Sequence, residues 1–190
     1  EWVDFGPTAP GRLDGARFKL TGRVAADLFG WPEVEGDVNI HGPLSFVIPS
    51  AAAGYAEMHG RWGRLPLSEI ATPAIALARR GLPQDWYTTL KVANSASILR
   101  GYPESARVYL RDGLPPVPPY QGALSYFRLG SLAETLERLA RAGWRDLYEG
   151  EIAASIVADV AAMGGVLTAE DLLGCKARVS PAVEAPWGSR

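Results

Sequence analysis

Apolar residues recur at helical spacing in the second half of the chain, between Ser131 and Leu172. They are Leu132, Leu136, Leu139 and Ala140, followed by Ile152, Ile156, Val157 and Val160. Intervals of three and four residues place such side chains on one face of a helix. The glycines that interrupt the pattern, where helices commonly end, are Gly143, Gly150, Gly164 and Gly165. The stretch therefore predicts a helix, a short helix, a third helix, a strand-like Val166-Leu167 and a new helix start.

Two capping boxes bound this stretch. Ser131 precedes Glu134 by three residues, and Thr168 precedes Asp171 by the same interval. In a capping box the hydroxyl accepts a hydrogen bond from an amide of the first turn, while the carboxylate accepts one from the first residue. We therefore expect helices to begin just after Ser131 and just after Thr168.

The first half of the chain changes from strand-like to helical near Ser50. Residues 1–48 are rich in Gly, Pro and β-branched residues and predict turns with short strands, the best candidate being Leu44–Ile48 before Pro49. Helices are expected over 51–61, 67–80 and 84–99. The Pro-rich stretch 114–122 excludes helix and central strand, and we interpret it as a surface crossover within one domain.

Composition and charge narrow the class of protein. The chain has 190 residues, 47% hydrophobic and 21% charged, which suits one globular domain or a large part of one. A net charge of −2 gives no electrostatic reason to bind nucleic acid or an anionic membrane. No apolar run approaches the roughly 20 residues that span a bilayer. The chain starts at Glu1 without methionine or a leader-like segment, so we expect a fragment, with cytoplasmic and exported locations both open.

Few side chains have the spacing of a catalytic or metal site. Cys175 is the single cysteine, and His41 and His59 are the only histidines, so a metal centre or a histidine-based triad is not expected. Glu149 lies on the polar face of a predicted helix, where solvation accounts for it. Asp171 already has its capping role. We expect neither a metal nor a cofactor.

Several motifs resemble one known family. The second half contains Leu-Ala-x-Thr-Leu from Leu132, Leu-Tyr-x-Gly-x-Ile-Ala from Leu147 and Gly-Gly-x-Leu-Thr-x-Glu-Asp-Leu from Gly164. The first half contains Trp-Gly-Arg-Leu-Pro-Leu from Trp62, and Pro-Ala-Ile-Ala-Leu-Ala from Pro73. These motifs resemble the large subunit of γ-glutamyltranspeptidase-like N-terminal-nucleophile amidohydrolases, over roughly residues 42–83 and 128–183.

The resemblance implies a fold and a mechanism. The complete fold is an α/β protein, the four-layered αββα sandwich, of which residues 1–190 supply part of the large (α) subunit, mostly helices with a few short strands. A precursor cleaves itself, and the small subunit carries the catalytic N-terminal threonine, whose own amine acts as base. This segment then holds no catalytic residue. The implied partners are that small subunit and a small-molecule amide substrate.

The N-terminal segment departs from the family at one informative position. Asp4, Phe5, Ala9 and Pro10 fit the pattern Asp-Phe-Arg-Glu-x-Ala-Pro of γ-glutamyl enzymes, but Gly6 replaces the arginine and Pro7 the glutamate. The family's arginine holds the substrate α-carboxylate, a task suited to a bidentate guanidinium. We therefore expect an acyl group other than γ-glutamyl, with Gly6, Pro7 and Arg12 as candidate substrate-binding residues.

Two alternatives stay open. A displaced cation, Arg12 or Arg17, could restore γ-glutamyl binding and make the protein a genuine γ-glutamyltransferase or glutathione hydrolase, although a solvated surface arginine accounts for either residue. The chain could also be a non-catalytic helical binding or assembly module built on the same scaffold.

Overall fold

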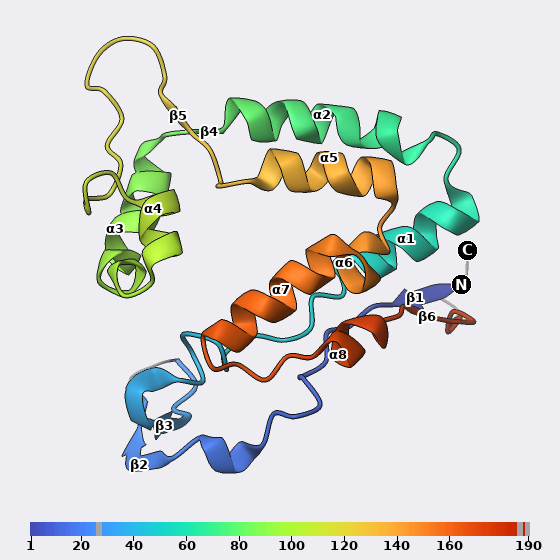
Figure 1. The fold of residues 1–190 in the computed structure, drawn as a ribbon, viewed down its shortest axis with the longest axis horizontal. Coiled ribbons are helices and arrows are strands. Elements are labelled where there is room, and N and C mark those ends of the chain that lie inside the picture. The colour runs from blue at the N-terminus through green and yellow to red at the C-terminus, as the bar shows by residue number, and fades with distance from the viewer. Residues whose placement is uncertain (26–27, 186–187, 189–190) are drawn as a thin grey trace. The chain divides into compact units, whose positions relative to one another are not determined.

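The computed structural model describes residues 1–25, 28–185 and 188 and divides into two compact units (Figure 1). Unit 1 combines Glu1–Arg64 with Ala142–Arg190, and unit 2 is Leu65–Arg141. No helix in the described ranges has the length and apolar character needed to cross a membrane.

Helices dominate both units. Unit 1 contains α1 (Ala51–Trp62), α6 (Asp146–Glu149), α7 (Glu151–Ala162), α8 (Ala169–Leu173), the 3-10 helices η1 (Gly15–Arg17) and η2 (Glu35–Asp37), and the strands β1 (Trp2–Asp4), β2 (Leu20–Val24), β3 (Pro32–Val34) and β6 (Arg178–Ser180). Unit 2 contains α2 (Leu67–Arg80), α3 (Trp86–Arg100), α4 (Pro103–Tyr109), the strands β4 (Leu82–Pro83) and β5 (Tyr126–Phe127), and most of α5 (Leu132–Ala142). The predicted predominance of helix with a few short strands is confirmed.

Within the described ranges, the strands pair in three two-stranded antiparallel sheets: β1 with β6, β2 with β3, and β4 with β5. In the first sheet Trp2 lies opposite Ser180 and Asp4 opposite Arg178. The N-terminal strand is therefore fixed by residues near the other end of the chain.

The core of unit 1 forms where α1, α6, α7 and α8 meet. Its buried residues are Ile48, Ala52, Ala53, Tyr148, Ala153, Val160, Leu167 and Leu172. Leu172 of α8 is 0% exposed and Tyr148 of α6 is 1% exposed. Since burying a large apolar side chain contributes about 1.5–3 kcal/mol, these two residues are major contributors to the stability of the unit.

The hydroxyl of Tyr148 joins α6 to the start of α1. It accepts a hydrogen bond from the Ala53 amide at 2.9 Å and donates one to the Pro49 carbonyl at 2.8 Å. Ser50 precedes α1 without a side-chain cap, so a tyrosine from another helix satisfies one of the free amides of the first turn. Burial raises the pKa of Tyr148 to about 12, against the opposing effect of the Ala53 amide.

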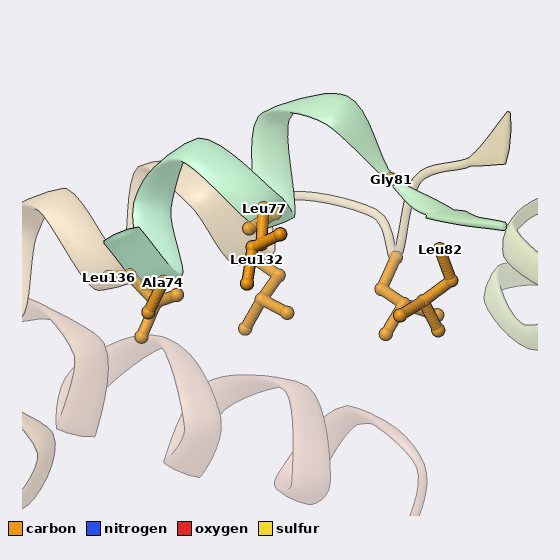
Figure 2. A pocket seen from close by; sticks show the side chains of 8 residues that line it. Ala74, Leu77, Gly81, Leu82, Leu132 and Leu136 are labelled. Carbon is orange, nitrogen blue, oxygen red and sulfur yellow. The ribbon is translucent and has the colours of Figure 1, made fainter. Parts of the chain in front are cut away.

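Unit 2 has a small core and an open apolar groove. Val92, Ala96 and Leu110 are buried between α3 and α4. Side chains of α2 and α5 line the groove, which measures about 230 Å³, and Figure 2 shows Leu77, Leu132 and Leu136 around it. Gly81 ends α2 with φ of 93°, and a Cβ there would lie 2.5 Å from the Phe127 carbonyl oxygen, so both conformation and space require glycine.

The structure agrees with most predicted elements and corrects two of them. The helices at 51–61, 67–80 and 84–99 are present as α1, α2 and α3, and Thr168 forms a complete capping box with Asp171. The side-chain bonds predicted between Ser131 and Glu134 stay a prediction.

Two predicted strands are wrong. Leu44–Ile48 is not a strand because Ser45 closes a turn onto the Gly42 carbonyl, and Ile48 makes a backbone hydrogen bond to Thr8 before entering the core. Val166-Leu167 is also without strand structure, and Leu167 enters the core from the connection between α7 and α8. The short helix α4 lies in a stretch for which no element was predicted.

Replacing Tyr148 with phenylalanine should destabilise unit 1 by about 1–3 kcal/mol, because the buried Ala53 amide loses its partner and the Pro49 carbonyl keeps only the weak donor of the Cys175 thiol. Urea unfolding of the full-length protein measures this loss. The matched control is Tyr55→Phe on α1, where the tyrosine is half exposed. Equal losses in the two variants would contradict the role assigned to the Tyr148 hydroxyl.

The raised pKa of Tyr148 also predicts a loss of stability in alkali. Below pH 10 the hydroxyl is protonated in both the folded and unfolded states, so its contribution is complete. Between pH 10 and about 12 the unfolded chain ionises first, and the free energy of unfolding falls. Urea unfolding below pH 10 and again within that interval should show a larger fall for the wild type than for Tyr148→Phe, whereas parallel falls would contradict this assignment.

Candidate functional site

The candidate site is the loop of residues 5–10, which follows β1 and carries Gly6 and Pro7. Its first turn is closed by Asp4, whose Oδ1 accepts a hydrogen bond from the Gly6 amide at 2.9 Å. Oδ2 of the same carboxylate accepts one from Arg178 of β6 at 2.6 Å. The Gly6 amide and then the Arg178 guanidinium hold the pKa of Asp4 below its usual value.

The middle of the loop is held against the start of α1. The Ser50 hydroxyl donates a hydrogen bond to the Phe5 carbonyl at 2.5 Å, and the Ile48 amide donates one to the Thr8 carbonyl at 2.8 Å. Phe5 packs directly on Gly54, where a Cβ would lie 2.4 Å from the ring. Any larger residue at position 54 would therefore displace the phenylalanine.

Asp171 fixes the far end of the loop. Its Oδ1 accepts a hydrogen bond from the Gly11 amide at 2.8 Å, across 160 positions of sequence. Its Oδ2 accepts from the Thr168 amide at 2.9 Å and the Thr168 hydroxyl at 3.0 Å. Burial acts to raise the pKa of Asp171, but the hydrogen bonds from Gly11 and Thr168 outweigh it and hold the pKa below its usual value. One carboxylate thus caps α8 and anchors the loop.

Gly6 and Pro7 are exposed on the fixed loop. Gly6 does not have the positive φ that favours glycine. A Cβ at this position would meet Asp4 Oδ1 at 3.3 Å, a tight contact that a shift of a few tenths of an ångström relieves. The backbone of the loop therefore accepts a side chain at position 6.

Arg12 lies beyond the loop and lines a cavity of about 460 Å³ together with Arg17. Gly6 and Pro7 are not among the residues that line this cavity. Of the three predicted site residues, Gly6 and Pro7 share one loop, and Arg12 belongs to the neighbouring cavity.

Cys175 and Glu149, which were also considered from the sequence, take part in contacts within unit 1. Cys175 is partly buried against the core of unit 1. Glu149 pairs with Arg145 at 3.1 Å, and Arg145 also donates to the Cys175 carbonyl. No group of three potential metal ligands occurs among the described residues. Sequence reasoning missed the anchoring roles of Ser50, Gly54 and Arg178.

Comparison of the sequence with known proteins finds related enzymes. The family described as Gamma-glutamyltranspeptidase matches residues 15–190. The glutathione hydrolase 5 proenzyme of Mus musculus is 33% identical over 149 residues, which are 75% of this chain and 24% of that protein. The acylase ACY 1 proenzyme of Pseudomonas sp. (strain V22) is 28% identical over 170 residues, 90% of this chain and 29% of that protein. This chain therefore spans about a quarter of the length of these relatives.

Solved structures give the same fold. The γ-glutamyltranspeptidase of Helicobacter pylori matches with a TM-score of 0.74 and 25% identity over 93% of this chain and 47% of that one. A cephalosporin acylase from Bacillus halodurans matches with a TM-score of 0.73 and 22% identity over 93% of this chain and 31% of that one. The predicted α/β fold class is confirmed.

Replacing Asp171 with alanine should release the end of the 5–10 loop at Gly11 and destabilise unit 1 by about 1–2 kcal/mol, since α8 loses its capping box and the Gly11 amide loses its hydrogen bond to the carboxylate. Amide hydrogen exchange measures the effect at Gly11, which should exchange faster. Asp159→Ala is the control, because Asp159 is an exposed residue of α7. Unchanged exchange at Gly11 in Asp171→Ala would contradict the anchoring role.

Proposed function

Because this chain belongs to the γ-glutamyltranspeptidase family, as its motifs predict, we propose that it is the large-subunit portion of an amidohydrolase or acyltransferase with an acyl specificity other than γ-glutamyl. The family match over residues 15–190 supports the first part of this proposal. Relatives named as a hydrolase and as an acylase support it further.

In the proposed mechanism the nucleophile comes from a second chain. Both curated relatives cited above are named proenzymes, which supports a precursor that matures by cleavage. The N-terminal threonine of the small subunit attacks the amide carbonyl, and its own amine takes the hydroxyl proton and passes it to the leaving amine. Water then hydrolyses the acyl-threonine, or a second amine accepts the acyl group. In this proposal the present chain contributes the 5–10 loop, whose shape and charge act on the choice of acyl group.

The absence of a cation at position 6 carries the specificity proposal. A substrate α-carboxylate is held best by a bidentate guanidinium, and glycine has no donor beyond its amide. That amide already donates to Asp4, and the Arg178 guanidinium is paired with the same carboxylate. The loop therefore offers no uncompensated positive charge at this position, which favours an acyl group without an α-carboxylate and α-amine.

The alternative with a displaced arginine has less support. Arg12 lines a cavity to which Gly6 and Pro7 do not contribute, so it does not replace the missing side chain on the same surface of the loop. Relatives named as enzymes likewise weigh against a purely non-catalytic module.

Replacing Gly6 with arginine should raise γ-glutamyl hydrolysis by the full-length protein. A guanidinium that binds the α-carboxylate is worth about 1.5–3 kcal/mol, which is about tenfold or more in kcat/KM. The assay compares p-nitroanilides with γ-glutamyl, glutaryl and short acyl groups. The wild type should prefer glutaryl or short acyl groups to γ-glutamyl.

Gly6→Gln is the control, because it adds a polar side chain of moderate length without charge. It should leave γ-glutamyl turnover near that of the wild type. Strong γ-glutamyl turnover by the wild type would contradict the proposed specificity, and no amidase activity on any of the acyl groups would contradict the proposed function itself.

A further inference from the structure

The cavity beside Arg12 combines cationic and apolar residues. It measures about 460 Å³ and lies wholly within unit 1. Arg12 and Arg17 come from the N-terminal segment, the second of them at the end of η1. Val157 and Ala161 come from α7, and Val166 and Leu167 from the connection to α8. Such a combination suits a ligand that has one charged group and an apolar body.

The two arginines differ in how far their charge is compensated. Hydrogen bonding to its own backbone is the first cause that lowers the pKa of Glu170, and the charge of Arg12 is a further one. Arg12 also helps to lower the pKa of Asp171, whose oxygens already accept from Gly11 and Thr168. Arg12 therefore has carboxylates of the protein itself for neighbours.

Arg17 makes no side-chain hydrogen bond or ion pair with any residue in the described ranges. Its pairing is confined to the backbone, where its amide donates to the Asp14 carbonyl. Among the residues that line the cavity, Arg12 and Arg17 are positive and Glu170 is negative, which leaves a surplus of one positive charge. A ligand with a single negative charge neutralises this surplus, whereas a dianion would exceed it.

We propose that this cavity binds a small amphipathic monocarboxylate, with Arg17 donating to the carboxylate and the side chains of Val157, Ala161 and Val166 contacting the apolar body. The planar guanidinium matches a carboxylate with two parallel hydrogen bonds. The cavity does not include Gly6 or Pro7, so the proposal is independent of the acyl specificity of the enzyme.

Methyl-labelled full-length protein titrated with phenylacetate tests this proposal. The methyl resonances of Val157, Ala161 and Val166 should shift to saturation, which locates the ligand in this cavity and separates it from binding elsewhere. Arg17→Ala should weaken the affinity at least about tenfold, because it removes the charge-assisted hydrogen bonds to the carboxylate.

Two controls make the result decisive. Phenylacetamide has the same shape without the charge and should bind at least about tenfold more weakly than phenylacetate. Lys19→Ala removes an exposed cation that does not line the cavity, and it should leave the affinity unchanged. The proposal is overturned if these methyls do not shift, if the amide binds as tightly as the acid, or if Lys19→Ala weakens binding as much as Arg17→Ala.

Discussion

The buried hydroxyl of Tyr148 is the interaction on which the arrangement of unit 1 depends. Helix α6 has a single turn and is too short to be stable by itself, because helix nucleation costs more than one turn returns. The hydrogen bonds of Tyr148 to Pro49 and Ala53 hold that turn against the start of α1. Gly150 allows α7 to begin at once, since a Cβ there would lie 2.0 Å from Asp146 Oδ1. The Leu-Tyr-x-Gly motif is therefore a joint between helices.

The position of the 5–10 loop follows from this joint. The residues that bind the loop, Ser50 and Ile48, lie directly before the helix that Tyr148 fixes. Asp171 adds the third attachment from α8, whose buried Leu172 belongs to the same core as Tyr148. The core of unit 1 and the loop that carries the candidate substrate residues are thus parts of one hydrogen-bonded structure.

The sequence predicted what depends on neighbouring residues and missed what depends on distant ones. The helices α1, α2 and α8 follow from local spacing, caps and glycines, and their predicted positions are confirmed. The bond between Asp171 and Gly11 has no local signal because it spans 160 positions. The apolar run Leu44–Ile48 predicted a strand, but burial alone does not distinguish a strand from a loop that enters the core.

The attachments of the 5–10 loop have an evolutionary consequence. On the loop side every bond uses a main-chain atom: the Phe5 and Thr8 carbonyls and the Gly6 and Gly11 amides. Main-chain atoms are common to all residues, proline's missing amide excepted, so the residues at positions 6 and 7 can be exchanged while the loop keeps its course. If this loop selects the acyl group, as proposed, a lineage can change its substrate through single codon changes without first rebuilding its scaffold.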